Sequence, residues 1–332
     1  DYANHAIRKI SPDGTTVTIA GTGKPGYLDA LGILSMFKNP KGLALDSVGN
    51  IYVADSGNHR IRMIDTLGNV SSFAGNSAGI LNGPKDVAKF SSPASLAIDG
   101  SNNIYVCDSG NSQIRKINSS GIVSTVAGVS AGYLDGSTNY ALLNNPAGIL
   151  LSTNKLYIAD QDNNRIRLLS LDNNTVSTLA GTGLAGYLDG NANKAAFKAP
   201  QTLALDRDGN ILVADSLNYR IRKISKTVTA NENYSSGDSN LIVSIITGSG
   251  SSGLIDGAQA FAKFKTPAGI VEDSKGNLFV VDQGNHVIRK IDEDGLVITF
   301  AGKGSAGYAD GSGLTAQFSS PAGIAIDSND NL

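Results

Sequence analysis

One segment of the chain, NIYVADSGNHRIRMI at positions 50–64, recurs in recognisable form five more times along the 332 residues. Six aspartates and six prolines mark corresponding positions of the copies, the proline comes before the aspartate in every copy that holds both, and a glycine follows each aspartate. The aspartates are Asp1, Asp55, Asp108, Asp160, Asp215 and Asp282. The prolines are Pro40, Pro93, Pro146, Pro200, Pro267 and Pro321. A period of about 50 residues is typical of propeller blades and solenoid units, so the fold is built from repeats.

Each repeat is predicted to form four short strands separated by turns. The first complete copy reads GLALD, NIYVAD, HRIRMI and VSSFAG, which are runs of strand length rich in β-branched residues. Between the first two runs, DSVGN at positions 46–50 has the composition of a hairpin turn. Units of four strands that repeat around an axis are the blades of a β-propeller.

The two ends of the chain each hold part of a repeat. The chain starts with DYANHAIRKI, which matches the later part of a unit, and stops with PAGIAIDSNDNL, which matches the earlier part. We expect the N-terminal strands to complete the C-terminal blade and so to close the ring without an open sheet edge. The prediction is an all-β, six-bladed β-propeller of four-stranded blades that forms one domain over residues 1–332.

Composition limits the classes of partner. The net charge is −2 and the pI is about 5.9, so we expect no nucleic-acid partner. The chain has no apolar run near the roughly 20 residues that span a bilayer, so we expect no membrane insertion. Cys107 is the only cysteine, which excludes an internal disulfide and predicts a buried, inert thiol. Sequons at Asn69, Asn118, Asn173 and Asn233 permit secretion, and we expect an extracellular or periplasmic location.

The motif PKGLALDSVGNIYVADSGNHRIRMI at positions 40–64 resembles the NHL repeat, and the resemblance covers essentially the whole chain. It implies a six-bladed propeller of a family whose members include scaffolds for protein, peptide, glycan or RNA, as well as a few enzymes. The long connections, such as GTGKPGYLDALGILSMFKNP at positions 21–40, resemble those of bacterial and plant members. We therefore expect the propeller to be one part of a larger, exported bacterial protein.

Residues that recur in every repeat are interpreted as structural. The set includes Arg8, Arg62, Arg115, Arg167, Arg222 and Arg289. A charge that every blade needs is most simply the partner of a carboxylate or carbonyl in a neighbouring blade. His5, His59 and His286 share one motif position in different repeats. Because packed sheets lie about 10 Å apart and zinc ligands lie about 2 Å from the metal, we predict no metal site there.

Residues that break the repeat are the candidates for binding. The first strand begins, and the second strand ends, on the rim that carries the long connections, so this rim is predicted to bind. Just after the opening proline the common pattern is Ala-Gly, and four polar residues depart from it. They are Lys41, Ser95, Gln201 and Thr202. We expect them to form the floor of a ligand pocket beside the central channel.

Glu272 is a fifth candidate, because it lies in GIVED where the other repeats have leucine or isoleucine. A buried carboxylate has a raised pKa or a partner, and it can act as an acid, a base or a metal ligand. The insertion at positions 226–241 is polar and aperiodic, and it is predicted to be a mobile loop.

The leading functional hypothesis is a noncatalytic recognition scaffold that binds a protein, peptide or glycan on the long-loop rim. The sequence predicts no catalytic residue, no metal site and no cofactor, because no triad, metal-ligand cluster or phosphate loop is recognisable. The alternative is a hydrolase or lyase at the channel mouth that uses Glu272, with or without a divalent metal ion.

Overall fold

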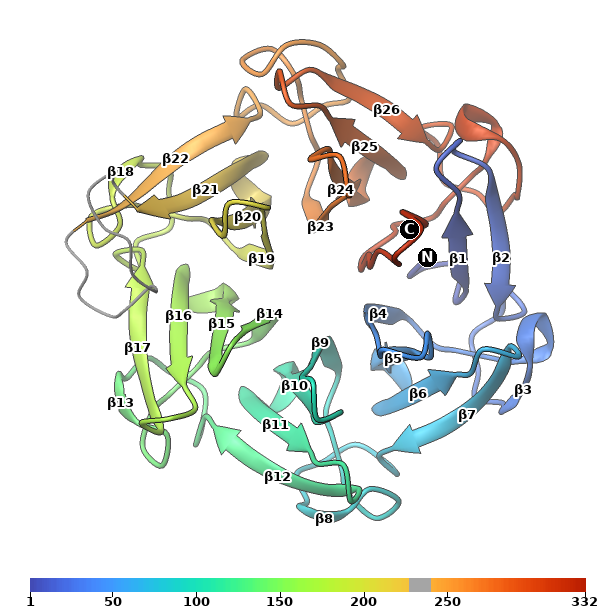
Figure 1. The fold of residues 1–332 in the computed structure, drawn as a ribbon, viewed down its shortest axis with the longest axis vertical. Helices are drawn as coiled ribbons and strands as arrows, with labels where there is room; N and C mark the ends of the chain where they lie inside the picture. The colour runs from blue at the N-terminus through green and yellow to red at the C-terminus, as the bar shows by residue number, and fades with distance from the viewer. Residues whose placement is uncertain (227–239) are drawn as a thin grey trace.

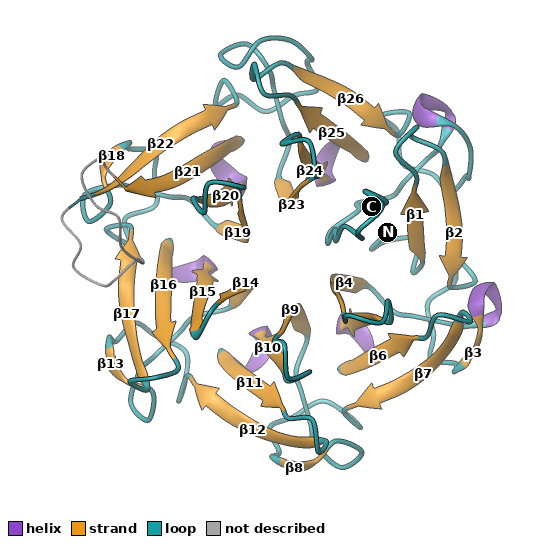
Figure 2. Cartoon of the chain, in the orientation of Figure 1, coloured by secondary structure: helices purple, strands orange, loops and turns teal. Residues whose placement is uncertain are grey.

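The structure is a computed structural model that describes residues 1–226 and 240–332. Its sheets stand around a central axis with one edge inward and one edge outward (Figure 1). Helical residues occur only as short 3-10 turns within this described part, and strands dominate (Figure 2). The all-β propeller class is therefore confirmed. Residues 227–239, which include the sequon at Asn233 and most of the insertion predicted to be mobile, lie outside the described residues.

The described residues form five complete blades, which we number 1 to 5 in chain order, and each begins at the axis. The innermost strands are β4 (Pro40–Leu45), β9 (Pro93–Ile98), β14 (Pro146–Ser152), β19 (Pro200–Leu205) and β23 (Pro267–Glu272). The second strands are β5 (Ile51–Asp55), β10 (Ile104–Asp108), β15 (Lys155–Asp160), β20 (Ile211–Asp215) and β24 (Leu278–Asp282). Each innermost strand is antiparallel to its second strand.

The outer half of each blade continues the meander. The third strands are β6 (Arg60–Ile64), β11 (Gln113–Ile117), β16 (Arg165–Ser170), β21 (Arg220–Lys226) and β25 (Val287–Ile291). The fourth strands are β7 (Asn69–Ala74), β12 (Ile122–Ala127), β17 (Thr175–Ala180), β22 (Leu241–Thr247) and β26 (Val297–Ala301). Short edge strands pair with four of them, namely β3 (Ala30–Leu31), β8 (Gly83–Pro84), β13 (Gly136–Ser137) and β18 (Gly190–Asn191). The long connections thus cover outer edges that are otherwise open to aggregation.

Short 3-10 turns complete the repeat. One turn follows each second strand, as η2 (Ser56–Asn58), η3 (Ser109–Asn111), η4 (Gln161–Asn163), η5 (Ser216–Asn218) and η6 (Gln283–Asn285). Two more lie in long connections, as η1 (Gly32–Leu34) and η7 (Gly313–Thr315). The residue after each of the turns η2 to η6 has a left-handed backbone. This conformation reverses the chain into the third strand.

The hydrophobic core lies between adjacent blades. One buried cluster joins Tyr52 and Ala54 of blade 1 to Leu96 and Val106 of blade 2, and the other interfaces are built in the same way. Each sheet is therefore apolar on both faces, which explains why the strands do not alternate cleanly between apolar and polar residues. No helix among residues 1–226 and 240–332 has the length and apolar character needed to cross a membrane.

The prediction of six four-stranded blades is wrong. In the described residues five sheets have four or five strands, but the sixth sheet contains only β1 (Ile7–Ile10) and β2 (Thr16–Ala20). Residues 321–327, which were expected to form its innermost strand, are not in a strand. β1 corresponds to the third strand of the complete blades, which pairs with the second strand. At the position of the second strand, Leu332 exchanges backbone hydrogen bonds with Ile10. The N-terminal strands therefore do not complete a four-stranded blade.

Each third strand carries a buried arginine, whose surroundings we name the arginine cluster. In blade 1 the Arg62 guanidinium is ion-paired with Asp55 at 2.9 Å and with Asp29 at 2.5 Å. It also donates to the carbonyl oxygen of Met36 and lies 5.0 Å from the centre of the Phe37 ring. These partners belong to the same blade and to the connection that leads into it. The arginine is thus structural, as predicted, but it does not reach a neighbouring blade.

Candidate functional site

The innermost strands begin around a cavity of about 300 Å³ on the long-connection rim, which we name the channel mouth. Its lining comes from all five blades and from the two-stranded sector. The polar lining residues are Tyr2, Lys41, Ser95, Ser109, Asn145, Gln161, Gln201, Thr202 and Gln283. The structure therefore brings together four of the five predicted site residues, namely Lys41, Ser95, Gln201 and Thr202.

In the sectors that have glycine at the channel mouth, the inner segments of adjacent sectors approach too closely for a side chain at that position. A Cβ atom on Gly42 would lie 2.6 Å from the carbonyl oxygen of Ala94, and one on Gly323 would lie 2.2 Å from that of Lys41. Gly148 has the same surroundings against Gln201. The Ala-Gly pattern of the repeats therefore reflects packing of backbone against backbone.

Ser95 and Thr202 replace this glycine in blades 2 and 4, and their hydroxyl groups bond to the next blade. The Thr202 hydroxyl donates to the carbonyl oxygen of Ala268. The Ser95 hydroxyl oxygen accepts a hydrogen bond from the backbone N–H of Ile149 at 3.3 Å. These two side chains line the channel mouth, but their hydroxyl groups also connect neighbouring blades, which sequence reasoning did not predict.

Lys41 and Gln201 have no such partner among the described residues. Each follows the opening proline of its innermost strand, where blades 2, 3 and 5 have alanine. Burial lowers the pKa of the Lys41 ammonium. The lining of the channel mouth contains no carboxylate. The mouth is therefore a ring of hydroxyl and amide groups with one cation.

Sequence reasoning missed Tyr2, Gln161 and Gln283, which also line the channel mouth. Each follows the repeated aspartate, and Gln161 and Gln283 occupy the first position of the 3-10 turn after a second strand. The other blades have serine at this position, as at Ser109. A comparison of the repeats at this one position would have found the two glutamines and the tyrosine as departures from serine.

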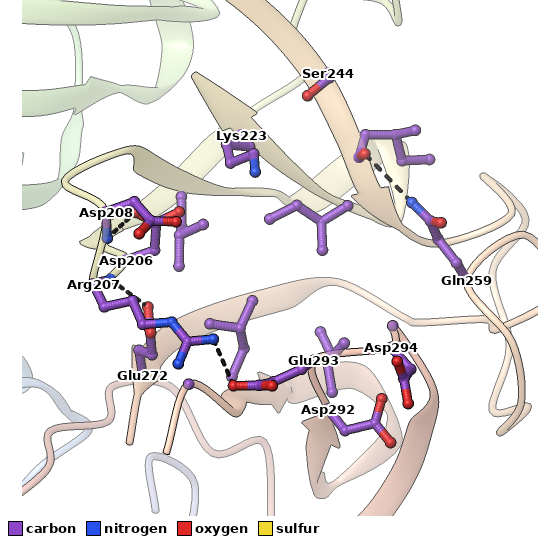
Figure 3. Close-up of a pocket in the computed structure, with 17 residues that line it drawn as sticks. Asp206, Arg207, Asp208, Lys223, Ser244, Gln259, Glu272, Asp292, Glu293 and Asp294 are labelled. Carbon is purple, nitrogen blue, oxygen red and sulfur yellow. Dashed lines mark hydrogen bonds and ion pairs between the residues drawn. The ribbon is translucent and has the colours of Figure 1, made fainter. Parts of the chain in front are cut away.

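The structure does not place Glu272 at the channel mouth. Glu272 ends β23, whereas Pro267 begins that strand, so Glu272 lies on the opposite rim. There it lines a second cavity, of about 420 Å³, between blades 4 and 5 (Figure 3). Its carboxylate accepts a hydrogen bond from the backbone N–H of Arg207 at 3.0 Å. Burial raises the pKa of Glu272 although this hydrogen bond opposes the shift.

The second cavity is strongly acidic. Carboxylates of Asp206, Asp208 and Glu293 surround Glu272, and the Arg207 guanidinium is ion-paired with Glu293 at 2.5 Å (Figure 3). Both members of this ion pair are more than half exposed to solvent. We name this region the acidic cavity.

At two positions that line the acidic cavity, blade 4 has aliphatic residues where blades 1 and 5 have aromatic ones. Leu212 stands in β20 where the other complete blades have tyrosine or phenylalanine, such as Tyr52 and Phe279. Ile246 stands in β22 where blades 1 and 5 have phenylalanine. In blade 1 the rings of Tyr52 and Phe73 pack edge to face at 4.9 Å, and aliphatic side chains leave part of that space open.

The histidines connect adjacent sectors of the ring. The Nδ1 atom of His59 accepts a hydrogen bond from the backbone N–H of Ser92 at 3.1 Å. His286 accepts one from Ser320 at 2.9 Å. No group of three His, Cys, Asp or Glu side chains with metal-ligand geometry occurs among the described residues. Cys107 is buried and free, and burial raises the pKa of its thiol well above the ordinary value.

The repeat pattern and the radial sheets agree with known sequences. The sequence profile of the NHL repeat matches residues 37–62 and 90–117. The chain belongs to the NHL-repeat family. It is 30% identical over 316 residues to SUPPRESSOR OF QUENCHING 1, a chloroplastic protein of Arabidopsis thaliana, and 30% identical over 327 residues to NHL repeat-containing protein 2 of Bos taurus.

These matches cover most of this NHL-repeat chain but a minority of its relatives. They include 87% and 88% of the chain, yet only 28% of the plant protein and 44% of the bovine protein. Both relatives are eukaryotic, so they lend no support to the expectation of a bacterial source. Secretion is not tested by these relatives and stays a prediction.

A solved structure shares the fold of this NHL-repeat chain. An auxiliary nutrient binding protein from Bacteroides thetaiotaomicron superposes with a TM-score of 0.69 at 15% identity. The superposition covers 97% of this chain and 72% of the other. The likeness is one of fold.

Proposed function

We propose that this NHL-repeat propeller is a noncatalytic recognition scaffold that binds a protein, peptide or glycan at the channel mouth. The observation that carries the proposal is the position of Lys41 and Gln201. Both break the repeat, both line the same cavity of about 300 Å³, and neither is hydrogen-bonded to another described residue.

The chemistry of the channel mouth supports recognition rather than catalysis. Amide and hydroxyl groups dominate its lining, and these groups orient a ligand without transferring protons at neutral pH. Glu272, which the sequence suggested as an acid or base, belongs to the acidic cavity on the other rim. The proposal therefore keeps Lys41, Ser95, Gln201 and Thr202 as the binding set and leaves Glu272 out.

The test is binding of the purified chain to peptide and glycan arrays. A Lys41→Ala/Gln201→Ala variant is expected to lose most of the signal on the bound features, by roughly 10-fold or more if two hydrogen bonds to the ligand are lost. Lys275→Ala/Gln259→Ala is the matched control, because it removes the same two functional groups from exposed positions away from the channel mouth. Equal binding by the wild type and the Lys41→Ala/Gln201→Ala variant would refute the channel mouth as the site.

A further inference from the structure

The charge of the channel mouth indicates which ligand chemistry it recognises. Lys41 is its one charged lining residue, and no ion pair to its ammonium occurs among the described residues. The buried aspartates that end the second strands already have partners. The Asp55 carboxylate, for example, is ion-paired with Arg62 and accepts a hydrogen bond from the Asn58 side chain. The charge of Lys41 is therefore left without a counterion from the protein.

A partly buried ammonium without a counterion is costly, and an anionic ligand would offset that cost. The four other repeats with Ala-Gly or Ala-Ser after the proline show that alanine fits this position, as at Ala94, Ala147 and Ala268. The ring thus does not need a lysine for packing. Its presence at a single position of the mouth indicates a role that the other sectors do not share.

We propose that the channel mouth binds the carboxylate group of a peptide, with the Lys41 ammonium as its ion-pair partner and the Gln201 amide as a hydrogen-bond partner to the adjacent peptide group. This inference rests on the proposed function and specifies its ligand. A carboxylate is the anion that fits, because Lys41 offers one positive charge and the mouth holds no second cation to neutralise a dianion.

The remaining lining favours a peptide over a glycan. Amide side chains of Asn145, Gln161, Gln201 and Gln283 both donate and accept hydrogen bonds, as the backbone of an extended peptide does. Tyr2 is the one aromatic residue in the described lining, whereas the flat apolar face of a sugar ring packs best on aromatic platforms. Capture of a carboxylate together with its neighbouring backbone is an established way to bind peptides.

The experiment compares carboxylate with amide in otherwise identical probes. The wild type is tested on a pool of random hexapeptides with free C-termini and on the same pool with C-terminal amides. A third pool carries C-terminal amides and has Asn and Gln in place of Asp and Glu. Oligosaccharides that end in a uronic acid, with their neutral counterparts, form the last arm.

The variants separate charge from shape. Lys41→Gln removes the charge, Lys41→Arg keeps it, and Lys275→Gln removes an exposed charge from the opposite rim. We expect the carboxylate preference to fall on the order of 10- to 100-fold in Lys41→Gln and to remain in the other two variants. Thermal unfolding of each variant verifies that the ring is intact.

The outcomes distinguish this inference from the proposed function. A preference for free C-termini identifies a terminal carboxylate as the ligand group. Loss of binding only in the third pool identifies an Asp or Glu side chain. Both outcomes support the inference. Equal binding to all peptide pools overturns it but leaves the scaffold function in place. Binding to uronic-acid probes alone overturns the peptide assignment. No binding in any arm overturns the inference, whereas the proposed function is decided separately by the peptide and glycan arrays.

Discussion

The arginine clusters and the channel mouth lie in the same blades but follow opposite rules. Each cluster repeats around the ring and holds a buried guanidinium between a buried aspartate of its own blade and a carbonyl oxygen of the connection that leads into the blade. The channel mouth differs from sector to sector, is open, and leaves the Lys41 ammonium without a counterion among the described residues. The difference shows that residues repeated in every blade hold the blade together. Residues that differ between blades are the ones available to a ligand.

The largest expected effect comes from breaking an arginine cluster. Arg222→Met leaves the Asp215 carboxylate buried without its ion-pair partner, at a cost of about 3–5 kcal/mol in the free energy of unfolding. Denaturant unfolding followed by circular dichroism measures it. Arg207→Met is the control, because it removes an ion pair between two side chains that are more than half exposed, where screening by solvent leaves little stabilisation. A loss in Arg222→Met no greater than in the control would mean that the clusters do not stabilise the blades.

A smaller effect is expected at the contact between blades beside the channel mouth. Thr202→Val removes the hydroxyl that donates to the carbonyl oxygen of Ala268, and it should lower the free energy of unfolding by about 1 kcal/mol. Thr66→Val serves as a comparison, because it removes an exposed hydroxyl without a hydrogen-bond partner among the described residues. If Thr202→Val is as stable as the wild type, the side chain is free to serve a ligand instead.

The histidine contacts between sectors should make stability depend on pH. Burial lowers the pKa of His5 and of His286 below the ordinary value of 6.5. The unfolded chain therefore binds these protons at a higher pH than the folded chain does, so stability is full above about 6.5 and is lost as the pH falls below it. Thermal unfolding across this range measures the effect.

Asparagine at the same position provides the control for that pH dependence. In blade 3 the Asn164 side-chain oxygen accepts the equivalent hydrogen bond from the backbone N–H of Ala199 at 3.0 Å. His5→Asn/His286→Asn should therefore keep the contacts and flatten the dependence of the unfolding temperature on pH. An unchanged slope in this variant would assign the pH dependence to other groups.

The smallest expected effect concerns the stability of the channel mouth. Lys41→Ala introduces the alanine that four other repeats have at this position, and it removes a partly buried charge. The variant should therefore have a free energy of unfolding that is higher by about 0.5 kcal/mol. The same variant loses ligand binding under the proposed function. A clear loss of stability would instead show that Lys41 supports the ring.

Much of the architecture follows from residues that are close together along the chain. The apolar runs, the hairpin turn at positions 46–50 and the repeated arginine predict four-stranded units of the NHL type, because strand pairing within a meander is set by local turns and periodicity. The same comparison of repeats identified Lys41 and Gln201 as exceptions. Both predictions needed only the order of residues within a repeat.

Contacts between sectors depended on the tertiary structure. Only packing revealed that Ser95 and Thr202 bond to the next blade and that Glu272 lines a cavity between blades 4 and 5. The incomplete sixth sector was equally hidden. The physical reason is that these contacts join residues a whole repeat or more apart, and their geometry is set by how closely the sheets approach around the axis rather than by their neighbours in the chain.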